Sequence, residues 1–170
     1  PAPRRIQYSM REIGYNRKQS VLYARRWAFG RNPAYYDFGQ IGGDCTNFVS
    51  QCLFAGCRVM NFTPVFGWYY RSANDRTASW TGVEFLYNFL TANDGAGPYA
   101  EEIPLVQLQP GDVIQLGRTG GDFYHSLLAV GFFGGVPLVA AHSFDAYARP
   151  LSSYSFERMR AIHILGARAD

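Results

Sequence analysis

Residues 42–53 read Gly-Gly-Asp-Cys-Thr-Asn-Phe-Val-Ser-Gln-Cys-Leu, and this stretch combines a glycine turn, a helix start and a thiol. Asp44 belongs to the residue types that cap helix N-termini, and the apolar residues after it recur at helical spacing. The stretch therefore predicts a helix that begins after Asp44 and carries Cys45 in its first turn. The apolar stripe of this helix consists of Cys45, Phe48, Val49, Cys52 and Leu53.

Cys45 is a candidate nucleophile because of this position. A cysteine attacks as the thiolate, and the unpaired N–H groups and macrodipole of a helix start lower its pKa from about 8.5 to roughly 3.5–7.5. The same N–H groups can hold an oxyanion, while Gly42 and Gly43 let a substrate backbone come close. The alternative is a buried structural cysteine, the commoner role of a lone Cys. The glycines, the cap and the thiol together favour catalysis.

A catalytic cysteine needs a histidine as its base, and the chain has 3 histidines. His125 begins an apolar strand, so its ring can face a neighbouring helix; a ring bonded to a loop carbonyl is the alternative. His142 closes the following strand. His163 lies in an apolar run where a ring satisfied by the backbone is expected, so it is left out of the site.

A hairpin turn decides which residue orients His125. If Gly134-Gly135 is a two-residue turn, His125 lies opposite Phe144, and His142 projects to the same face of the sheet as His125. His142 is therefore the expected orienting group. Asp145 is the alternative third member, which a β-bulge in the hairpin would favour.

Helical periodicity precedes strand alternation along the chain, which is typical of an α+β fold rather than of βαβ units. Most strands are expected after Pro110-Gly111, and residues 58–80 are expected to form a long structured loop with a short strand or helix near residues 66–70. Helices are expected to begin at Asn16, at Cys45 and at a capping box over residues 81–84, and strands to cover residues 112–116, 125–133, 136–143 and 160–165.

The composition fits one globular domain over residues 1–170, with 48% hydrophobic and 17% charged residues. The 12 Tyr, 13 Phe and 3 Trp suit an aromatic groove for an extended substrate. A net charge of +3 favours anionic partners, but the basic residues are dispersed, so no nucleic-acid partner is expected. No apolar run is long enough for a membrane span, and the start at residues 1–5 lacks the apolar core of a signal peptide.

The cysteines cannot all pair with one another, because there are 3 of them. Cys52 is expected in the core and Cys57 at the end of the helix, where the two could pair in an oxidising compartment. Their spacing matches neither a zinc site nor a disulfide framework. No metal and no cofactor is expected.

Several motifs closely resemble the bacterial putative amidase domain family over nearly the whole chain, and residues 42–51 are the most specific of them. That family looks related to the NlpC-type cell-wall cysteine peptidases and the CHAP amidases. One departure is Gly56-Cys57, where the family pattern has two glycines. The other matching motifs are Tyr15-Asn16-Arg17, Tyr23-Ala24, Asn32-Pro33-Ala34-Tyr35, Ser79-Trp80-Thr81, Gly111-Asp112-Val113-Ile114-Gln115, Tyr124-His125-Ser126, Ala141-His142-Ser143 and Arg149-Pro150-Leu151-Ser152.

The resemblance implies a papain-like fold, in which helices of the N-terminal part pack on a C-terminal antiparallel sheet that bears the histidine. It also implies a cysteine amidase or peptidase that hydrolyses an amide, either in peptidoglycan stem peptides or between those peptides and the glycan. Carried over by position, it assigns Cys45 as nucleophile, His125 as base and His142 as orienting group.

The resemblance also implies substrate contacts. Asp44 is expected to hold a substrate amine, and Tyr35 and Trp68 are expected near the cleft, although either aromatic residue could instead belong to the core. We expect a monomer that acts on a peptide or peptidoglycan-type amide. Its location is expected to be extracellular or cell-wall associated, with a signal or further domains outside these residues; a cytoplasmic location is left open.

Two other functions fit the same residues. An acyl transferase would use the same nucleophile and base, with an amine in place of water. A non-catalytic wall-binding module would keep Cys45 only for packing, and the presence of Cys45, His125 and His142 together argues against it.

Overall fold

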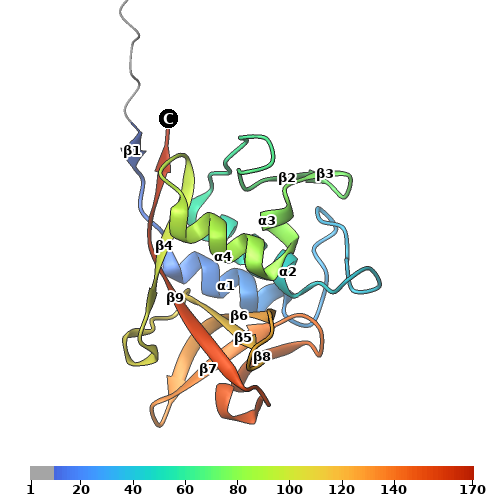
Figure 1. The fold of residues 1–170 in the computed structure, drawn as a ribbon, viewed down its shortest axis with the longest axis vertical. Coiled ribbons are helices and arrows are strands. Elements are labelled where there is room, and N and C mark those ends of the chain that lie inside the picture. Colours follow the sequence, from blue (N-terminus) through green and yellow to red (C-terminus); the bar gives the residue numbers. More distant parts are fainter. Residues whose placement is uncertain (1–9) are drawn as a thin grey trace, which may run out of the picture.

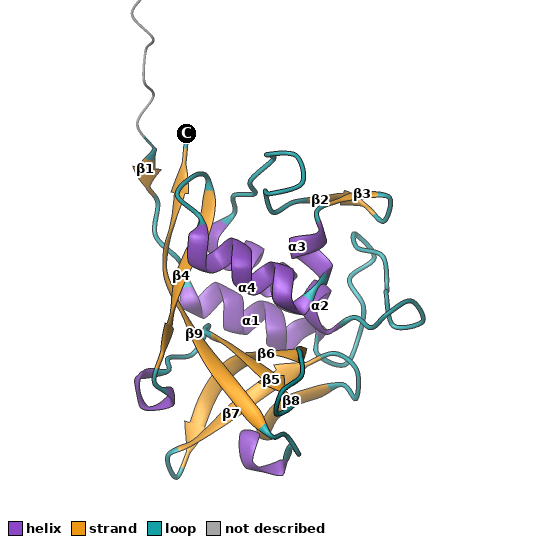
Figure 2. Ribbon diagram, in the orientation of Figure 1, coloured by secondary structure: helices purple, strands orange, loops and turns teal. Residues whose placement is uncertain are grey.

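The computed structural model describes residues 10–170, so the start of the chain assessed above lies outside the described residues. Helices gather on one side of the molecule and long antiparallel strands on the other, as Figure 1 and, by element type, Figure 2 show. This arrangement confirms the α+β class. Within residues 10–170, no helix has the length and apolar character that crossing a membrane requires.

The helices begin near the places that the sequence indicates, with one error. Asn16 caps the first helix, because its side-chain oxygen accepts from the backbone N–H of Gln19. The capping box predicted at residues 81–84 is wrong: Gly82 precedes the last helix without a side-chain cap, and Glu84 instead accepts from the N–H of Phe123. The helices are α1 (Arg17–Trp27), α2 (Cys45–Cys57), α3 (Ala78–Thr81) and α4 (Val83–Ala92), with 3-10 turns η1 (Leu105–Gln107) and η2 (Leu151–Ser153).

The strands form one large antiparallel sheet in the order β1-β9-β5-β6-β7-β8, with β4 also paired to β9. The sequence-predicted strands correspond to β5, β6, β7 and β9; β2 begins at the end of the segment where a short strand or helix was expected, and β1, β3, β4 and β8 were not predicted. The bounds are β1 (Arg11–Glu12), β2 (Tyr70–Ser72), β3 (Asp75–Arg76), β4 (Gly97–Ile103), β5 (Val113–Gly117), β6 (Phe123–Phe133), β7 (Val136–Ala141), β8 (Ala146–Pro150) and β9 (Arg158–Ala169), of which β2 and β3 form a separate small hairpin.

The β6–β7 hairpin contains a bulge that the sequence did not reveal. Phe133 pairs with Val136, as a two-residue turn at Gly134-Gly135 requires. Between Ala129 and Gly131 the register shifts by one residue, so Leu128 pairs with Ala140. A shift of one residue exchanges the two faces of a strand beyond it. Side chains past the bulge therefore face opposite to the direction that the unshifted hairpin predicts.

Both faces of the sheet are covered. One apolar core lies between the sheet and the helices and includes Phe48, Leu53, Trp80 and Leu90, all of them buried. A second, smaller core lies on the other face and is closed by the segment around Leu151. α2 lies in the first core, and ten of its 13 residues are buried.

Gly56 allows α2 to approach the start of α1, and its replacement tests this contact. A Cβ added at Gly56 would lie 2.4 Å from the Tyr15 ring and 3.0 Å from the backbone oxygen of Asn16. We expect Gly56→Ala to lower the free energy of unfolding by about 1–3 kcal/mol through overpacking. In a helix without such crowding, the same change would raise the free energy of unfolding by up to about 1 kcal/mol.

The control for this measurement is Gly131→Ala, because an added Cβ there meets nothing within 4 Å. It should change the free energy of unfolding by no more than about 0.5 kcal/mol. Urea unfolding of both variants compares them. An unchanged or raised stability in Gly56→Ala would contradict the close contact of the two helices.

Candidate active site

Cys45 is the first residue of α2 and is partly exposed. The turn before it uses two glycines in the left-handed region, Gly42 with φ of 81° and Gly43 with φ of 99°, where a residue with a Cβ would be strained. Within the described residues, Asp44 does not cap the helix through its side chain. The first N–H groups of α2 therefore remain available beside the thiol.

The thiol lies at the end of the β6–β7 ladder. Thr46 bonds its hydroxyl to that of Ser126 on β6 at 2.9 Å, which fixes the first turn of α2 against this strand. Ser126 directly follows His125 in β6. The first turn of α2, which begins with Cys45, therefore lies beside the start of β6, and the contact runs through Thr46 and Ser126.

The His125 ring lies beside Tyr154 and Arg149. Its centroid is 6.1 Å from that of Tyr154, which follows η2. Within residues 10–170 the ring makes no hydrogen bond, and the buried Tyr154 hydroxyl has no hydrogen-bond partner either. Within the described residues, the His125 ring therefore makes no hydrogen bond to the Cys45 thiol, although Ser126 beside it bonds to Thr46.

Cys45 and His125 do not have the pKa values that the expected thiolate–imidazolium ion pair requires. Burial raises the pKa of the Cys45 thiol, although the N–H of Ser126 and the hydroxyl of Thr46 act in the opposite direction. Burial and the nearby Arg149 cation lower the pKa of His125 to about 4. The expected lowering of the Cys45 pKa is thus not seen, because burial outweighs the helix start. At neutral pH the resting pair is a thiol and a neutral imidazole.

His142 does not orient His125 in this structure. Its Nδ1 lies 2.5 Å from a carboxylate oxygen of Asp44, its Nε2 lies 2.9 Å from the Trp27 carbonyl oxygen, and its ring stacks on Phe48. The bulge in β6 explains the difference, because it turns His142 to the face that carries Ser126 and α2. The expectation of a His142–His125 contact is corrected accordingly.

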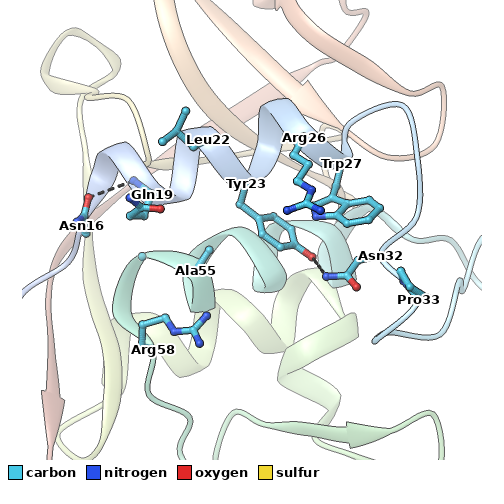
Figure 3. Close-up of a pocket in the computed structure, with 11 residues that line it drawn as sticks. Asn16, Gln19, Leu22, Tyr23, Arg26, Trp27, Asn32, Pro33, Ala55 and Arg58 are labelled. Carbon is cyan, nitrogen blue, oxygen red and sulfur yellow. Dashed lines mark hydrogen bonds between the residues drawn. The ribbon is translucent and has the colours of Figure 1, made fainter.

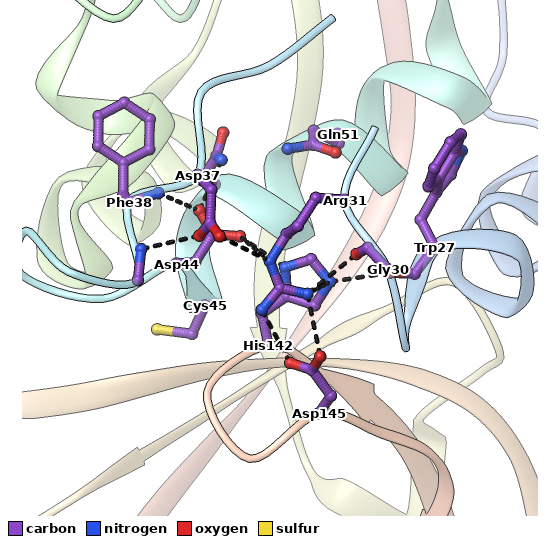
Figure 4. Close-up of polar contacts among 12 residues, drawn as sticks. Trp27, Gly30, Arg31, Asp37, Phe38, Asp44, Cys45, Gln51, His142 and Asp145 are labelled. Carbon is purple, nitrogen blue, oxygen red and sulfur yellow. Dashed lines mark hydrogen bonds and ion pairs between the residues drawn. The ribbon is translucent and has the colours of Figure 1, made fainter. Parts of the chain in front are cut away.

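Asp145 does not take that place either. Its two carboxylate oxygens accept from the guanidinium of Arg31, each at 3.0 Å. Arg31 also lies 3.4 Å from Asp37 and 3.2 Å from the His142 ring. Figure 4 shows Arg31 at the centre of this cluster, with the Cys45 thiol pointing away from it. The cluster holds the loop before α2 to the turn after β7.

Asp44 is fully engaged in this cluster and is 1% exposed. One oxygen accepts from the Phe38 N–H and the Asn47 amide, and the other meets His142. Although burial alone would raise the pKa of Asp44, these bonds lower it overall. The expected contact between Asp44 and a substrate amine is corrected, because no carboxylate oxygen is left for one.

The two aromatic candidates differ in exposure. Trp68 is fully buried and donates its ring N–H to the Ser50 hydroxyl, so its expected position at a cleft is wrong. Tyr35 is half-buried and stacks on Trp80, with centroids 6.0 Å apart. Both belong to the aromatic part of the core.

The other two cysteines and the third histidine have structural roles. Cys52 and Cys57 are buried and unpaired, and the Cys57 thiol donates to the Val59 carbonyl. The expectation that the backbone satisfies the His163 ring is wrong, because its Nδ1 bonds to the buried carboxylate of Asp112 at 2.9 Å. Across residues 10–170, no group of three or more His, Cys, Asp or Glu side chains could hold a metal ion.

Sequence reasoning missed Thr46, Ser126 and Arg31. Thr46 and Ser126 directly follow Cys45 and His125, so their adjacency to the two candidates was a usable signal. Arg31 carried no such signal, because its partners lie on segments far apart in the sequence.

The chain matches the family model described as a putative amidase domain over residues 14–165. The uncharacterized protein YhbB of Bacillus subtilis (strain 168) is 36% identical over 144 residues, which are 82% of this chain and 45% of YhbB. This chain therefore spans just under half of the length of that relative. No solved structure matches it.

The buried Asp44 is expected to stabilise the fold far more than Asp145 does. Asp44→Asn leaves His142 without its carboxylate partner, and we expect a loss of about 3–5 kcal/mol in the free energy of unfolding. Asp145→Asn, at a partly exposed pair, should cost at most about 1 kcal/mol. Urea unfolding at neutral pH measures both.

Lowering the pH should reduce the difference in the free energy of unfolding between the parent and Asp44→Asn. Because the folded-state pKa of Asp44 is lowered, its carboxylate stabilises the fold above the ordinary pKa of about 4, and this stabilisation is lost as the pH falls below that value. Equal stabilities of Asp44→Asn and Asp145→Asn at neutral pH would contradict the role of the buried carboxylate.

The charge of Arg149 is expected to hold the pKa of His125 down. Arg149→Met removes a cation that disfavours the imidazolium, so the pKa of His125 should rise from its value of about 4. NMR titration of the His125 ring protons measures this without any substrate. Lys18→Met, on the exposed face of α1, removes an equal charge and should leave the titration unchanged. A titration near 6.5 in the parent would refute the burial of this ring.

Proposed function

The chain belongs to the putative amidase domain family, and from this premise we propose that it hydrolyses amide bonds with Cys45 as nucleophile and His125 as base. The observation that supports the proposal is the Cys45 thiol at the start of α2, whose next residue, Thr46, bonds to Ser126, the residue after His125. We further propose that the arrangement is papain-like, with the helix that bears the thiol packed against the antiparallel sheet that bears the histidine.

The resting protonation states give His125 the role of general base. A neutral imidazole is ready to accept the thiol proton, and an uncharged thiol is stable in its buried position until substrate binds. Catalysis requires the His125 ring to move to the thiol when substrate binds, because in this structure the ring packs beside Tyr154 and shares the face of Leu116. Apo structures often show such catalytic hydrogen bonds only after substrate binding.

The proposed reaction has two stages. The thiol proton passes to His125 as the sulfur–carbon bond forms, and the N–H groups at the start of α2 stabilise the oxyanion. The imidazolium then gives its proton to the amide nitrogen as the carbon–nitrogen bond breaks and the amine leaves. Water, deprotonated by His125, cleaves the thioester and releases the acid, which restores the thiol.

We propose Tyr154 as the group that positions His125, in the place that His142 does not fill. The two rings are neighbours, and the Tyr154 hydroxyl is buried without another partner in the described residues. A buried hydroxyl without a hydrogen-bond partner costs free energy, so a hydrogen bond between Tyr154 and the His125 ring would be favourable. The Arg149 guanidinium, which lies 3.7 Å from the centre of the Tyr154 ring, holds this residue in place.

We propose a peptide amide of bacterial cell-wall peptidoglycan as the substrate, and an extracellular or cell-wall location. The resemblance of the motif block to wall-cleaving cysteine peptidases supports this choice. Acyl transfer to an amine would use the same residues. Adding a free amine to the reaction and analysing the products distinguishes transfer from hydrolysis.

Replacement of the nucleophile tests the proposal directly. We expect Cys45→Ala to release fragments from purified peptidoglycan at least about a thousandfold more slowly than the parent protein, as removal of a nucleophile does in related mechanisms. Mass spectrometry of the soluble fragments measures the rate and identifies the bond. Cys57→Ser is the matched control, because its hydroxyl can still donate to the Val59 carbonyl.

Two results would contradict parts of the proposal. Undiminished release by folded Cys45→Ala would show that Cys45 is not the nucleophile. No release by the folded parent protein would exclude peptidoglycan as the substrate.

A further inference from the structure

A hollow lies on the helical side of the molecule, away from the thiol. It has a volume of about 770 Å³ and lies where α1, the end of α2 and the loop after α1 meet (Figure 3). Cys45 begins α2 and Arg58 follows its last residue, so the helix separates them by roughly 20 Å at 1.5 Å per residue. The lining residues are Asn16, Gln19, Leu22, Tyr23, Arg26, Trp27, Asn32, Pro33, Ala55, Gly56 and Arg58.

The hollow has two positive charges and no negative one. Arg26 and Arg58 line it, and no carboxylate does. All 13 Asp and Glu side chains of the chain lie within the described residues, and none forms an ion pair with either arginine. The guanidinium groups of Arg17, Arg31 and Arg168, by contrast, each have an acidic partner. The charge of this hollow is therefore uncompensated.

Arg58 stands at a position where an arginine costs stability. It is the C-cap of α2 and has a φ of 62°, in the left-handed region. Glycine is the favoured residue at such helix ends, because a side chain is strained there. Strain of this kind is typical of functional positions. Figure 3 shows the side chain of Arg58 directed toward the middle of the hollow.

The rest of the lining suits a peptide better than a small inorganic anion. The Tyr23 hydroxyl donates to Gln51 and accepts from Asn32, so it forms a fixed part of the wall. The carboxamide of Gln19 makes no hydrogen bond within the described residues, and a carboxamide can pair with the N–H and C=O groups of a peptide backbone. Trp27 and Leu22 add apolar surface for the peptide's carbon atoms.

We propose that this hollow binds an acidic peptide segment, with Arg26 and Arg58 contacting its carboxylates. Guanidinium groups bind carboxylates through paired, charge-assisted hydrogen bonds. Trp27 links the hollow to the candidate active site, because its side chain lines the hollow while its carbonyl oxygen lies 2.9 Å from the His142 ring. The proposal deepens the proposed function by placing a peptide-binding site on the same chain, but its test needs no turnover.

The experiment is isothermal titration calorimetry with an acetylated, amidated Glu-Ala-Glu-Ala-Glu peptide and its glutamine counterpart. The parent protein and Cys45→Ala should bind the acidic peptide alike, so a failure of the proposed catalysis would leave this result intact. Arg26→Gln and Arg58→Gln should each weaken binding about tenfold, the loss expected for a charge-assisted hydrogen bond. Arg25→Gln, an equal charge change on an exposed neighbour that does not line the hollow, should bind as the parent does.

A further variant separates binding from folding. Arg58→Gly replaces a strained residue by the one that the left-handed C-cap favours, so it should raise the melting temperature while it loses affinity. Each of three results would overturn the proposal: equal binding of the glutamine peptide, an equal loss in Arg25→Gln, or displacement of the peptide by inorganic phosphate at the peptide's own concentration. Absence of binding to the parent would also overturn it.

Discussion

The buried bond between Asp44 and His142 is the contact on which the candidate site depends. It joins the residue before Cys45 to the end of β7, which lies almost a hundred positions later in the chain, and both side chains are about 1% exposed. A buried carboxylate is stable only when its oxygens are paired. Phe38, Asn47 and His142 supply those partners from separate segments. The position of the thiol is therefore set by the same bonds that satisfy this one carboxylate.

This arrangement divides the polar residues near the thiol into two groups. Asp44, His142, Arg31 and Asp145 form a fixed ion cluster on the helical side. His125, on β6, has no hydrogen-bond partner in the described residues, so no hydrogen bond has to break before its ring moves. A fixed cluster beside an unbonded imidazole suits a reaction in which a proton must be taken from the thiol and later delivered to a leaving amine. The raised pKa of Cys45 keeps it in the less reactive thiol form in the absence of substrate.

The sequence predicted the local features well and the long-range ones less well. The helical stripe after Asp44 and the glycines before it were sufficient to place Cys45 at a helix start. The prediction of the group that orients His125 was wrong because one extra residue in β6, between Ala129 and Gly131, reverses the two faces of the strand. A glycine inside a strand often marks a bulge, but the prediction considered a bulge only at the glycine pair of the turn. The prediction that Trp68 lies near a cleft was wrong because a motif match shows neither how deeply a side chain is buried nor which groups it bonds. Trp68 donates its ring N–H to a hydroxyl inside the core. Strand β4, with its Gly97-Pro98 start and two glutamates, lacks the alternation of a half-buried strand.

The position of β9 in the sheet has a consequence for the order in which the molecule assembles. β9 pairs with β1, β4 and β5, and so connects both ends of the described chain to the sheet. Contacts between residues so distant in sequence form late, because the intervening chain must first be ordered. A nascent chain that has reached β8 already contains Cys45, His125 and His142, but its sheet still lacks the strand that joins β1 and β4 to β5. During synthesis on the ribosome, the candidate catalytic residues are thus all made before the sheet can be completed.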